Sequence, residues 1–181
     1  MTTRWEYTLT PEEEKICYWV GIERQKPYLD SPEKNRNYFE GNFHETLQHQ
    51  IAAASELASA RMFGRYDFVP HVNKWKTQED IPGYEIRYVM PKEAYHSQQY
   101  ALRFNTRVDD PQAVYILLIE GVGIKSRRRQ EDGWVGKPFK AIGWLYGYEA
   151  VKPEFASNFG DHIYQVPRER LWPMSALGLG E

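Results

Sequence analysis

Residues 43–64, "FHETLQHQIAAASELASARMFG", are the segment that decides the fold. With about 100° between successive residues of a helix, the larger apolar side chains and two alanines fall on one stripe. The stripe consists of Phe43, Leu47, Ile51, Ala54, Ala58 and Met62. Such a stripe is typical of a helix that packs on a sheet, and Gly64 is placed to end the helix as a C-cap residue.

Glu56 falls nearly opposite this apolar stripe. Its neighbours on that side are Ala52, Ala53 and Ala60. Because small residues let another backbone come close, Glu56 need not point into bulk water. Periodicity alone leaves a second interpretation open, in which Glu56 is an ordinary exposed helix glutamate.

The residues before the long helix predict another helix. Thr10 suits the N-cap, the proline after it suits the first helical position, and three glutamates follow at the positive end of the helix dipole. We expect this helix to turn Ile16, Trp19 and Val20 toward the core. Residues 26–42, with two prolines and a glycine, are expected to form a loop.

After residue 64 the pattern changes to strands. The expected strands are residues 68–75, 84–90, 100–108, 114–121 and 139–150. The run 114–119 is apolar without alternation, as in a central strand that is covered on both faces. We therefore predict an α+β domain with a mixed sheet of about five strands and the long helix packed on it. Residues 76–90 would lie at the edge of a central hairpin.

The composition is that of one soluble globular domain, with 181 residues of which 41% are hydrophobic, 15% aromatic and 27% charged. Within it, residues 1–42 would be helix and loop, 43–150 the core, and 151–181 an irregular tail that wraps the core. The formal net charge of -2 gives no overall basic field, so a nucleic-acid site would depend on local charge placement.

The single cysteine, Cys17, excludes an internal disulfide and is expected in the core. No apolar run approaches the roughly 20 residues that cross a bilayer, and the first residues lack the pattern of a secretory signal. We therefore expect a cytoplasmic protein without a membrane partner.

Residues 76–90, "KTQEDIPGYEIRYVM", carry the chemistry that this fold could use. On a strand, Glu85 and Arg87 project side by side, and the Pro-Gly turn after Asp80 returns its carboxylate toward Glu85. Two carboxylates that close repel each other unless a cation lies between them, and oxygen ligands of this kind suit Mg²⁺ or Mn²⁺. Asp80 and Glu85 are therefore candidate metal ligands, and Arg87 could neutralise a phosphate. A salt-bridged, solvated strand face is the competing interpretation.

The order of Glu56 on a helix, then Asp80, then Glu85-Ile86-Arg87 resembles the PD-(D/E)xK nuclease superfamily. In that superfamily a helical acid precedes an aspartate and a (D/E)-x-K tripeptide on the next strand. The wider layout is similar to small proteins encoded by bacteriophages and prophages. Five segments carry this similarity, in the order "SELASARMFG", "KTQEDIPGYEIR", "DPQAVYILLIEG", "AIGWLYGYEA" and "VPRERLWPMSAL".

The resemblance implies a restriction-endonuclease-like fold and a metal-dependent nuclease that cleaves DNA phosphodiesters with Mg²⁺ or Mn²⁺. It implies that Asp80 and Glu85 hold the metal and that Arg87 faces the scissile phosphate. Glu56 would orient a metal-bound water or complete the metal shell.

Arg87 departs from the family pattern, which has lysine at this position. Arginine keeps the positive charge but cannot readily lose a proton. Lys74 or Lys76, one strand earlier, could take the role of that lysine, with Lys76 as the reserve cation of the site. The alternative is a non-catalytic phage accessory protein that binds a host protein or nucleic acid on a degenerate nuclease fold.

Basic residues between the last two strands are candidate nucleic-acid contacts. They are Lys125, Arg127, Arg128 and Arg129, to which Lys74 is added because it lies beside a tryptophan. Phosphate-pairing charge next to a stacking ring suits nucleic acid. A solvated hairpin loop is an equally compatible interpretation.

Overall fold

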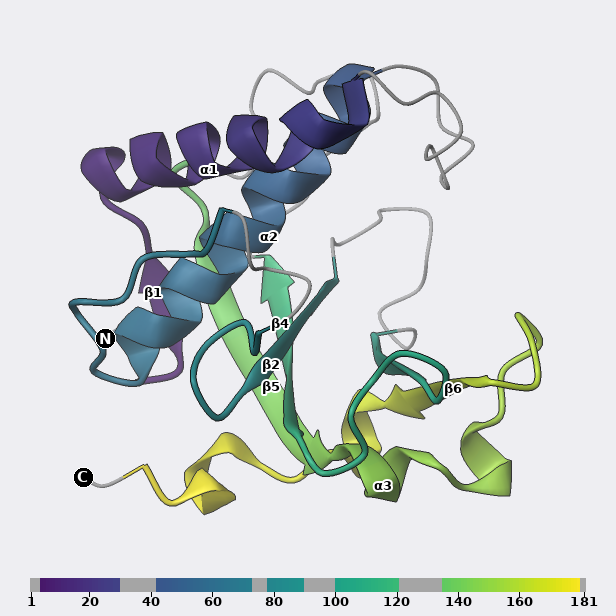
Figure 1. The fold of residues 1–181 in the computed structure, drawn as a ribbon. Coiled ribbons are helices and arrows are strands. Elements are labelled where there is room, and N and C mark those ends of the chain that lie inside the picture. The colour runs from purple at the N-terminus through teal and green to yellow at the C-terminus, as the bar shows by residue number, and fades with distance from the viewer. Residues whose placement is uncertain (1–3, 30–41, 73–77, 90–99, 121–134, 180–181) are drawn as a thin grey trace.

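The structure is a computed structural model that describes residues 4–29, 42–72, 78–89, 100–120 and 135–179. A four-stranded sheet lies at its centre, with two long helices on one face and a two-stranded sheet on the other (Figure 1). The helices are α1 (Pro11–Leu29), α2 (Asn42–Met62) and α3 (Gly147–Ala150). The strands are β1 (Glu6–Thr8), β2 (Glu85–Val89), β3 (Ala101–Asn105), β4 (Val114–Glu120), β5 (Pro138–Tyr146) and β6 (Ile163–Pro167). Three short 3-10 helices are η4 (Pro153–Phe155), η5 (Arg168–Arg170) and η6 (Met174–Leu177).

The central sheet is mixed and has the strand order β1-β5-β4-β2. β5 is antiparallel to both β1 and β4, whereas the edge strand β2 runs parallel to β4. The α+β class and the mixed sheet are thus confirmed, with four strands in place of five. β2 lies at an edge, but the predicted hairpin was wrong, because the chain passes through β3 before it returns as the parallel neighbour β4.

Other strand predictions were corrected at their ends. Residues 68–72 form no strand, and the rest of that segment lies outside the described residues. β5 stops at Tyr146, because α3 begins at the next residue, Gly147. A Cβ atom on Gly147 would lie 2.7 Å from the backbone oxygen of Asp110, so only glycine fits against that backbone. The Glu149 carboxylate accepts the Tyr146 N–H at 2.9 Å and closes this helix start. β1 and β6 were missed, since three and five residues carry little periodicity.

The central strand β4 divides the core into two halves. Ile116 and Leu118 pack on the side of α2, whereas Tyr115 and Leu117 pack on the side of β3 and β6. All four side chains are buried. The prediction of a strand covered on both faces is confirmed.

The long helix α2 is covered on two sides. Its predicted stripe packs in the core, and the described members are buried or partly buried: Leu47, Ile51, Ala54, Ala58 and Met62. The small-residue side is covered by α1, which lies across α2 (Figure 1). A Cβ atom on Gly21 of α1 would lie 2.6 Å from the backbone nitrogen of Gln50, so the helix backbones touch there. In the described ranges no helix has the length and apolar character needed to cross a membrane.

Both predicted helix ends are confirmed. The Thr10 hydroxyl accepts the Glu13 N–H at 3.3 Å, and the Glu13 carboxylate accepts the Thr10 N–H at 3.0 Å, which caps the start of α1. At the end of α2, Gly64 has φ 74°, and Arg65 N–H donates to the oxygen of Ala60 at 2.8 Å. This left-handed C-cap satisfies carbonyls that the last turn leaves free.

The inward face of α1 differs from the predicted one. Val20 and Cys17 are fully buried, whereas Ile16 and Trp19 are 36% and 55% exposed, so the assignment of those two to the core was wrong. The face that α1 turns to the core and to α2 carries Cys17, Val20, Gly21 and Arg24, and Ile16 and Trp19 lie outside it. α1 also continues through Pro27, in its last turn where few helical hydrogen bonds are lost, so this stretch is helix and not loop.

The C-terminal segment packs on the sheet. Trp172 pairs with Trp144 of β5 through two backbone hydrogen bonds, of 2.9 and 3.0 Å. Gly143 permits this approach, because a Cβ atom there would lie 2.8 Å from the backbone oxygen of Trp172. Met174 is buried in the core on the α2 side, which holds the segment beyond Trp172 against the protein body.

Candidate active site

The turn before β2 brings Asp80 back to Glu85. Ile81 and Tyr84 pair across it, with backbone N···O distances of 3.1 and 2.7 Å, and Gly83 takes the positive φ of 90° that the reversal needs. The Asp80 carboxylate then accepts the N–H of Ile86 at 2.8 Å. The sequence prediction that the Pro-Gly turn returns Asp80 to the neighbourhood of Glu85 is confirmed.

Asp80 and Glu85 form a coupled pair of carboxyl groups. Burial raises the pKa of both, and the charge of Asp80 further raises that of Glu85, to about 7. A hydrogen bond between the two side chains lowers the pKa of Asp80 in part. Both carboxyl groups therefore hold a proton to a higher pH than an exposed carboxyl group does. The carboxylates of Asp80 and Glu85 lie 3.8 and 3.4 Å from the Arg87 guanidinium at the edge strand β2, so they are close enough to each other to bind one metal ion.

Arg87 lies between three carboxylates. Its guanidinium is 3.4 Å from Glu85, 3.8 Å from Asp80 and 2.9 Å from Asp109. It also lies 4.9 Å from the ring centroid of Tyr115. The planar guanidinium pairs with carboxylates and stacks on the ring of Tyr115 at the same time, and a lysine ammonium cannot make both contacts in this way.

Asp109 was not singled out from the sequence as a site residue. Besides Arg87, it accepts the backbone N–H of Asn105 at 2.7 Å. The available signal was the acidic pair at 109–110 after a strand, which reads equally well as a turn.

Glu56 is buried, as one of the two interpretations of its helix predicted, with only 4% of the residue exposed. Both of its carboxylate oxygens accept hydrogen bonds from Arg24, each at 2.8 Å. Burial raises the pKa of Glu56 to about 7, against the effect of Arg24, and the charges of Asp80 and Glu85 add to the rise. Glu56 is thus electrostatically coupled to the pair, while its oxygens are already engaged by Arg24.

Arg24 was also missed from the sequence. It is 2% exposed, and its Nε donates to the backbone oxygen of His71 at 2.8 Å. The signal was its spacing: it follows Cys17 and Val20 by seven and four residues, which places a charge on the buried face of α1. A buried charge of this kind indicates a buried partner.

A cavity of about 250 Å³ opens beside this cluster, with room for several water molecules. Its walls come from α1, α2, the turn and β2. The lining residues are Arg24, His49, Ala52, Ser55, Glu56, Asp80, Ile86, Arg87 and Tyr88. Three of the predicted site residues therefore border one space, and Glu85 contacts two of them.

Carboxyl groups outnumber guanidinium groups in the cluster by four to two. The members are Glu56, Asp80, Glu85 and Asp109 against Arg24 and Arg87. In the described ranges, no three His, Cys, Asp or Glu side chains are arranged to hold a metal ion. Asp80 and Glu85 are a pair, however, and Mg²⁺ is commonly held by one or two carboxylates with water and phosphate oxygens. The pair fits such an ion.

The remaining predicted site residues lie outside the described residues. They are Lys74, Lys76, Lys125, Arg127, Arg128 and Arg129. Their roles stay predictions. Comparisons of the chain with known protein families, with curated proteins and with solved structures find no match.

Proposed function

We propose that the chain is a metal-dependent nuclease that acts on DNA phosphodiesters and has a restriction-endonuclease-like fold. The observation that carries the proposal is the turn that returns Asp80 to the neighbourhood of Glu85, where the two carboxyl groups lie beside Arg87 and an open cavity. The order of a helix with Glu56, a turn with Asp80 and a strand with Glu85 and Arg87 supports the fold assignment.

Asp80 and Glu85 are the residues that would hold Mg²⁺ or Mn²⁺, an ion that can activate a water and stabilise charge on a phosphodiester. Glu85 loses its proton near neutral pH, because its pKa is about 7. The pair then presents two negative charges to one point in space. Arg87, fixed by Tyr115 and Asp109, binds a phosphate oxygen next to that point.

Glu56 and Arg24 position the site in this proposal. Their bidentate pair links α2 to α1, and Arg24 also holds the chain at His71. The positive charge of Arg24 also helps to keep Asp80 ionised, since it acts to lower the pKa of that carboxyl group.

A second candidate function is a non-catalytic phage accessory protein that binds a host protein or nucleic acid. The observation that favours it is that the charged groups of the site already pair with one another. Arg24 donates to both carboxylate oxygens of Glu56. Arg87, in the place of lysine, pairs with three carboxylates. A fold that has lost its chemistry would tolerate such internal neutralisation.

Cleavage assays separate the two functions. Purified protein is incubated with supercoiled, linear duplex and single-stranded DNA in Mg²⁺, Mn²⁺ or EDTA. We expect cleavage in the presence of either metal and none in EDTA. Asp80→Asn and Glu85→Gln are expected to lower the cleavage rate at least 100-fold, because each removes a charged ligand oxygen while it keeps the side-chain size.

The matched control is Asp67→Asn, which removes an exposed carboxylate away from the cluster. It should cleave like the wild-type protein. The nuclease proposal is refuted if no substrate is cut under any metal condition, or if both Asp80→Asn and Glu85→Gln cut as fast as Asp67→Asn. The first of these outcomes favours the accessory protein.

A further inference from the structure

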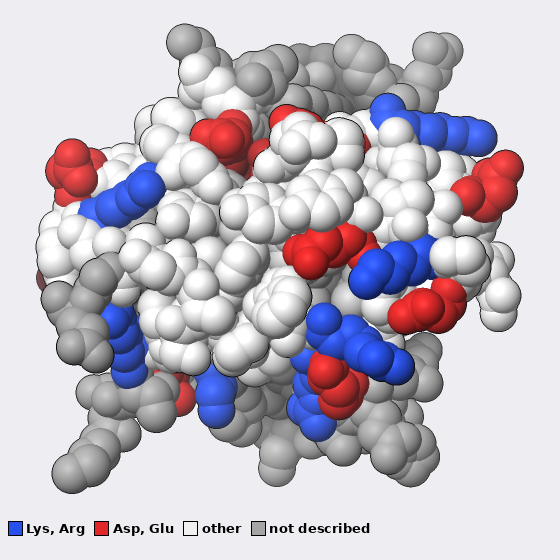
Figure 2. All heavy atoms as spheres, turned by 90° about the horizontal axis from the view of Figure 1, so that it is seen from below, with Lys and Arg blue, Asp and Glu red and all other residues white. Residues whose placement is uncertain are grey.

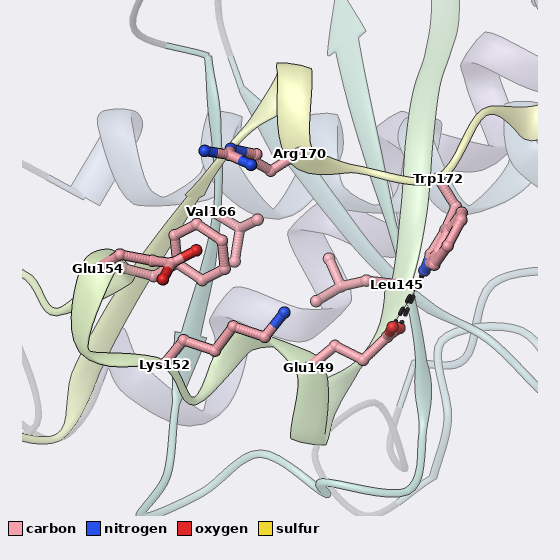
Figure 3. Close-up of a pocket in the computed structure, with 8 residues that line it drawn as sticks. Leu145, Glu149, Lys152, Glu154, Val166, Arg170 and Trp172 are labelled. Carbon is pink, nitrogen blue, oxygen red and sulfur yellow. Dashed lines mark hydrogen bonds between the residues drawn. The ribbon is translucent and has the colours of Figure 1, made fainter.

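A second pocket, of about 140 Å³, lies between β5, α3, β6 and the C-terminal segment, and it shares no residue with the candidate active site. Its floor is apolar and is formed by the buried side chains of Leu145, Phe155 and Val166. Lys152 and Arg170 reach toward this floor from opposite sides (Figure 3). We call this space the Trp172 pocket, after the tryptophan at one end of it (Figure 3).

Trp172 is exposed and yet held in one orientation. Its indole N–H donates to the two carboxylate oxygens of Glu149, at 3.0 and 3.3 Å, as the dashed lines in Figure 3 indicate. Its backbone is paired with Trp144 of β5. The residue nevertheless keeps 52% of its surface exposed. Because the indole is already held in place and its ring is accessible, stacking of another flat group on it costs little side-chain entropy.

The pocket lining carries two cations, Lys152 and Arg170, and two carboxylates, Glu149 and Glu154. Among the described residues, neither the Lys152 ammonium nor the Arg170 guanidinium makes a hydrogen bond or an ion pair, whereas the nearby Arg168 is paired with Glu169. The Lys152 ammonium lies 5.7 Å from the ring centroid of Phe155. The Glu149 carboxylate is engaged by the indole of Trp172, so both cations keep donors for a phosphate oxygen.

Two further aromatic rings are accessible, at the end of β5 and in α3. Tyr146 and Tyr148 stack with their ring centroids 5.4 Å apart and their planes at 11°, and 38% and 53% of these residues is exposed. Figure 2 shows the face of the molecule on which α3 lies, where uncharged side chains form a broad area bordered by acidic and basic ones. At the pocket, the accessible ring of Trp172 together with the cations of Lys152 and Arg170 combines the two features that bind single strands, base stacking and phosphate pairing.

We propose that the Trp172 pocket binds single-stranded DNA, with a base stacked on Trp172 and a backbone phosphate between Lys152 and Arg170. A protein partner fits less well, because an interface core is depleted in unpaired charges. The inference deepens the proposed nuclease function by naming a substrate subsite, but it depends on different residues.

Glu154 supplies a sharp test of this charge arrangement. Its carboxylate borders the pocket at the end away from Trp172 and has no ion-pair partner among the described residues (Figure 3). A negative charge there repels a phosphate, so Glu154→Gln should tighten binding about 3-fold. If Glu154 had only a structural role, its substitution would not increase the affinity for DNA.

The experiment measures binding without cleavage. Fluorescence anisotropy of a labelled 20-nucleotide oligodeoxythymidine is recorded in EDTA, so the result does not depend on metal or on nuclease activity. We expect Trp172→Ala to weaken binding about 10-fold and Trp172→Phe to retain most of it, because phenylalanine still stacks. Lys152→Gln with Arg170→Gln should weaken binding and reduce the dependence of the affinity on salt.

Matched controls come from α1, on the other face of the sheet (Figure 1). Trp19 is 55% exposed, close to the exposure of Trp172, and Lys15 is an exposed cation. Trp19→Ala and Lys15→Gln should bind like the wild-type protein. Binding that Trp172→Ala and the double cation variant leave unchanged would overturn the proposal, as would an absence of binding at low salt. A Trp172→Ala variant that alters self-association but not DNA binding would instead indicate a protein-docking surface.

The subsite and the nuclease fail separately. Loss of cleavage in Asp80→Asn with normal binding in EDTA supports both proposals. Cleavage without any effect of Trp172→Ala on binding overturns only the subsite, and binding without cleavage by the wild-type protein overturns only the nuclease.

Discussion

Replacing Gly21 with alanine is expected to destabilise the protein, although alanine is the better helix former. In a helix interior the change from glycine to alanine gains about 1 kcal/mol on its own. At this site, however, the new Cβ atom would lie 2.3 Å from Cγ, 2.6 Å from the backbone nitrogen and 2.8 Å from Cα of Gln50. The side-chain atom can move, but the backbone of α2 cannot, so α1 and α2 must separate.

The loss in free energy of unfolding follows from these distances. Ordinary Cβ contacts begin at 3.4 Å, so a contact of 2.6 Å requires a shift of 0.8 Å. Overpacking of this kind costs about 1–3 kcal/mol. The shift also pulls Arg24, which follows Gly21 by one turn, away from Glu56 at 2.8 Å, where a charged hydrogen bond contributes about 1.5–3 kcal/mol. After the gain in helix propensity of about 1 kcal/mol, the net loss is about 1.5–5 kcal/mol.

The assay is urea unfolding followed by circular dichroism. A loss of this size corresponds to a melting temperature about 10 °C lower in a protein of this length. Lys15→Gly, on an exposed position of α1, calibrates helix propensity in the same helix and should lose about 1 kcal/mol. A Gly21→Ala variant as stable as the wild-type protein, or more stable, would refute the close helix contact and with it the reasoning for Arg24.

Three further predictions concern the charged cluster. Arg24→Met should lose about 3–5 kcal/mol in urea unfolding, because Glu56 keeps a buried charge without a partner, and Arg24→Met with Glu56→Leu should regain most of it. The wild-type protein should melt at a higher temperature at pH 5.5 than at pH 7.5 in calorimetry. Glu85, with a pKa raised from 4.5 to about 7, holds its proton in the fold at pH 5.5 and loses it toward pH 7.5, whereas the unfolded chain has already released it at pH 5.5. Glu85→Gln should narrow this difference in melting temperature. Mg²⁺ should raise the melting temperature more at pH 8 than at pH 6, since protons compete for Asp80 and Glu85; an equal rise in Asp80→Asn would contradict this site.

The parts of the fold that follow from local patterns could be predicted from the sequence. The stripe of α2 and its Gly64 cap are set by residues within one segment, and so is the return of Asp80 to Glu85 through the Pro-Gly turn. The unbroken apolar run of β4 likewise required a position covered on both faces. In each case the pattern that predicts the feature lies within one short segment of the sequence.

The parts that depend on distant segments could not be predicted in this way. The partner of Glu56 is Arg24, 32 residues before it, and Asp109 lies 22 residues beyond Arg87. The parallel pairing of β2 with β4 depends on where the chain returns after β3. A periodic pattern says that a charge is buried or that a strand is covered, but it does not say which segment covers it.

The position of β2 gives the candidate active-site residues a second effect. An edge strand presents free N–H and C=O groups on which another chain can pair and aggregate. On the outer side of β2, the Ile86 N–H donates to Asp80 at 2.8 Å, and the Ile86 oxygen accepts from Arg87 at 3.4 Å. Asp80 and Arg87 thus occupy both outward backbone groups of Ile86, which opposes strand addition at this point of the edge. Asparagine at position 80 keeps an acceptor for Ile86 and alanine does not, so the charge of the site can be removed while the edge stays protected.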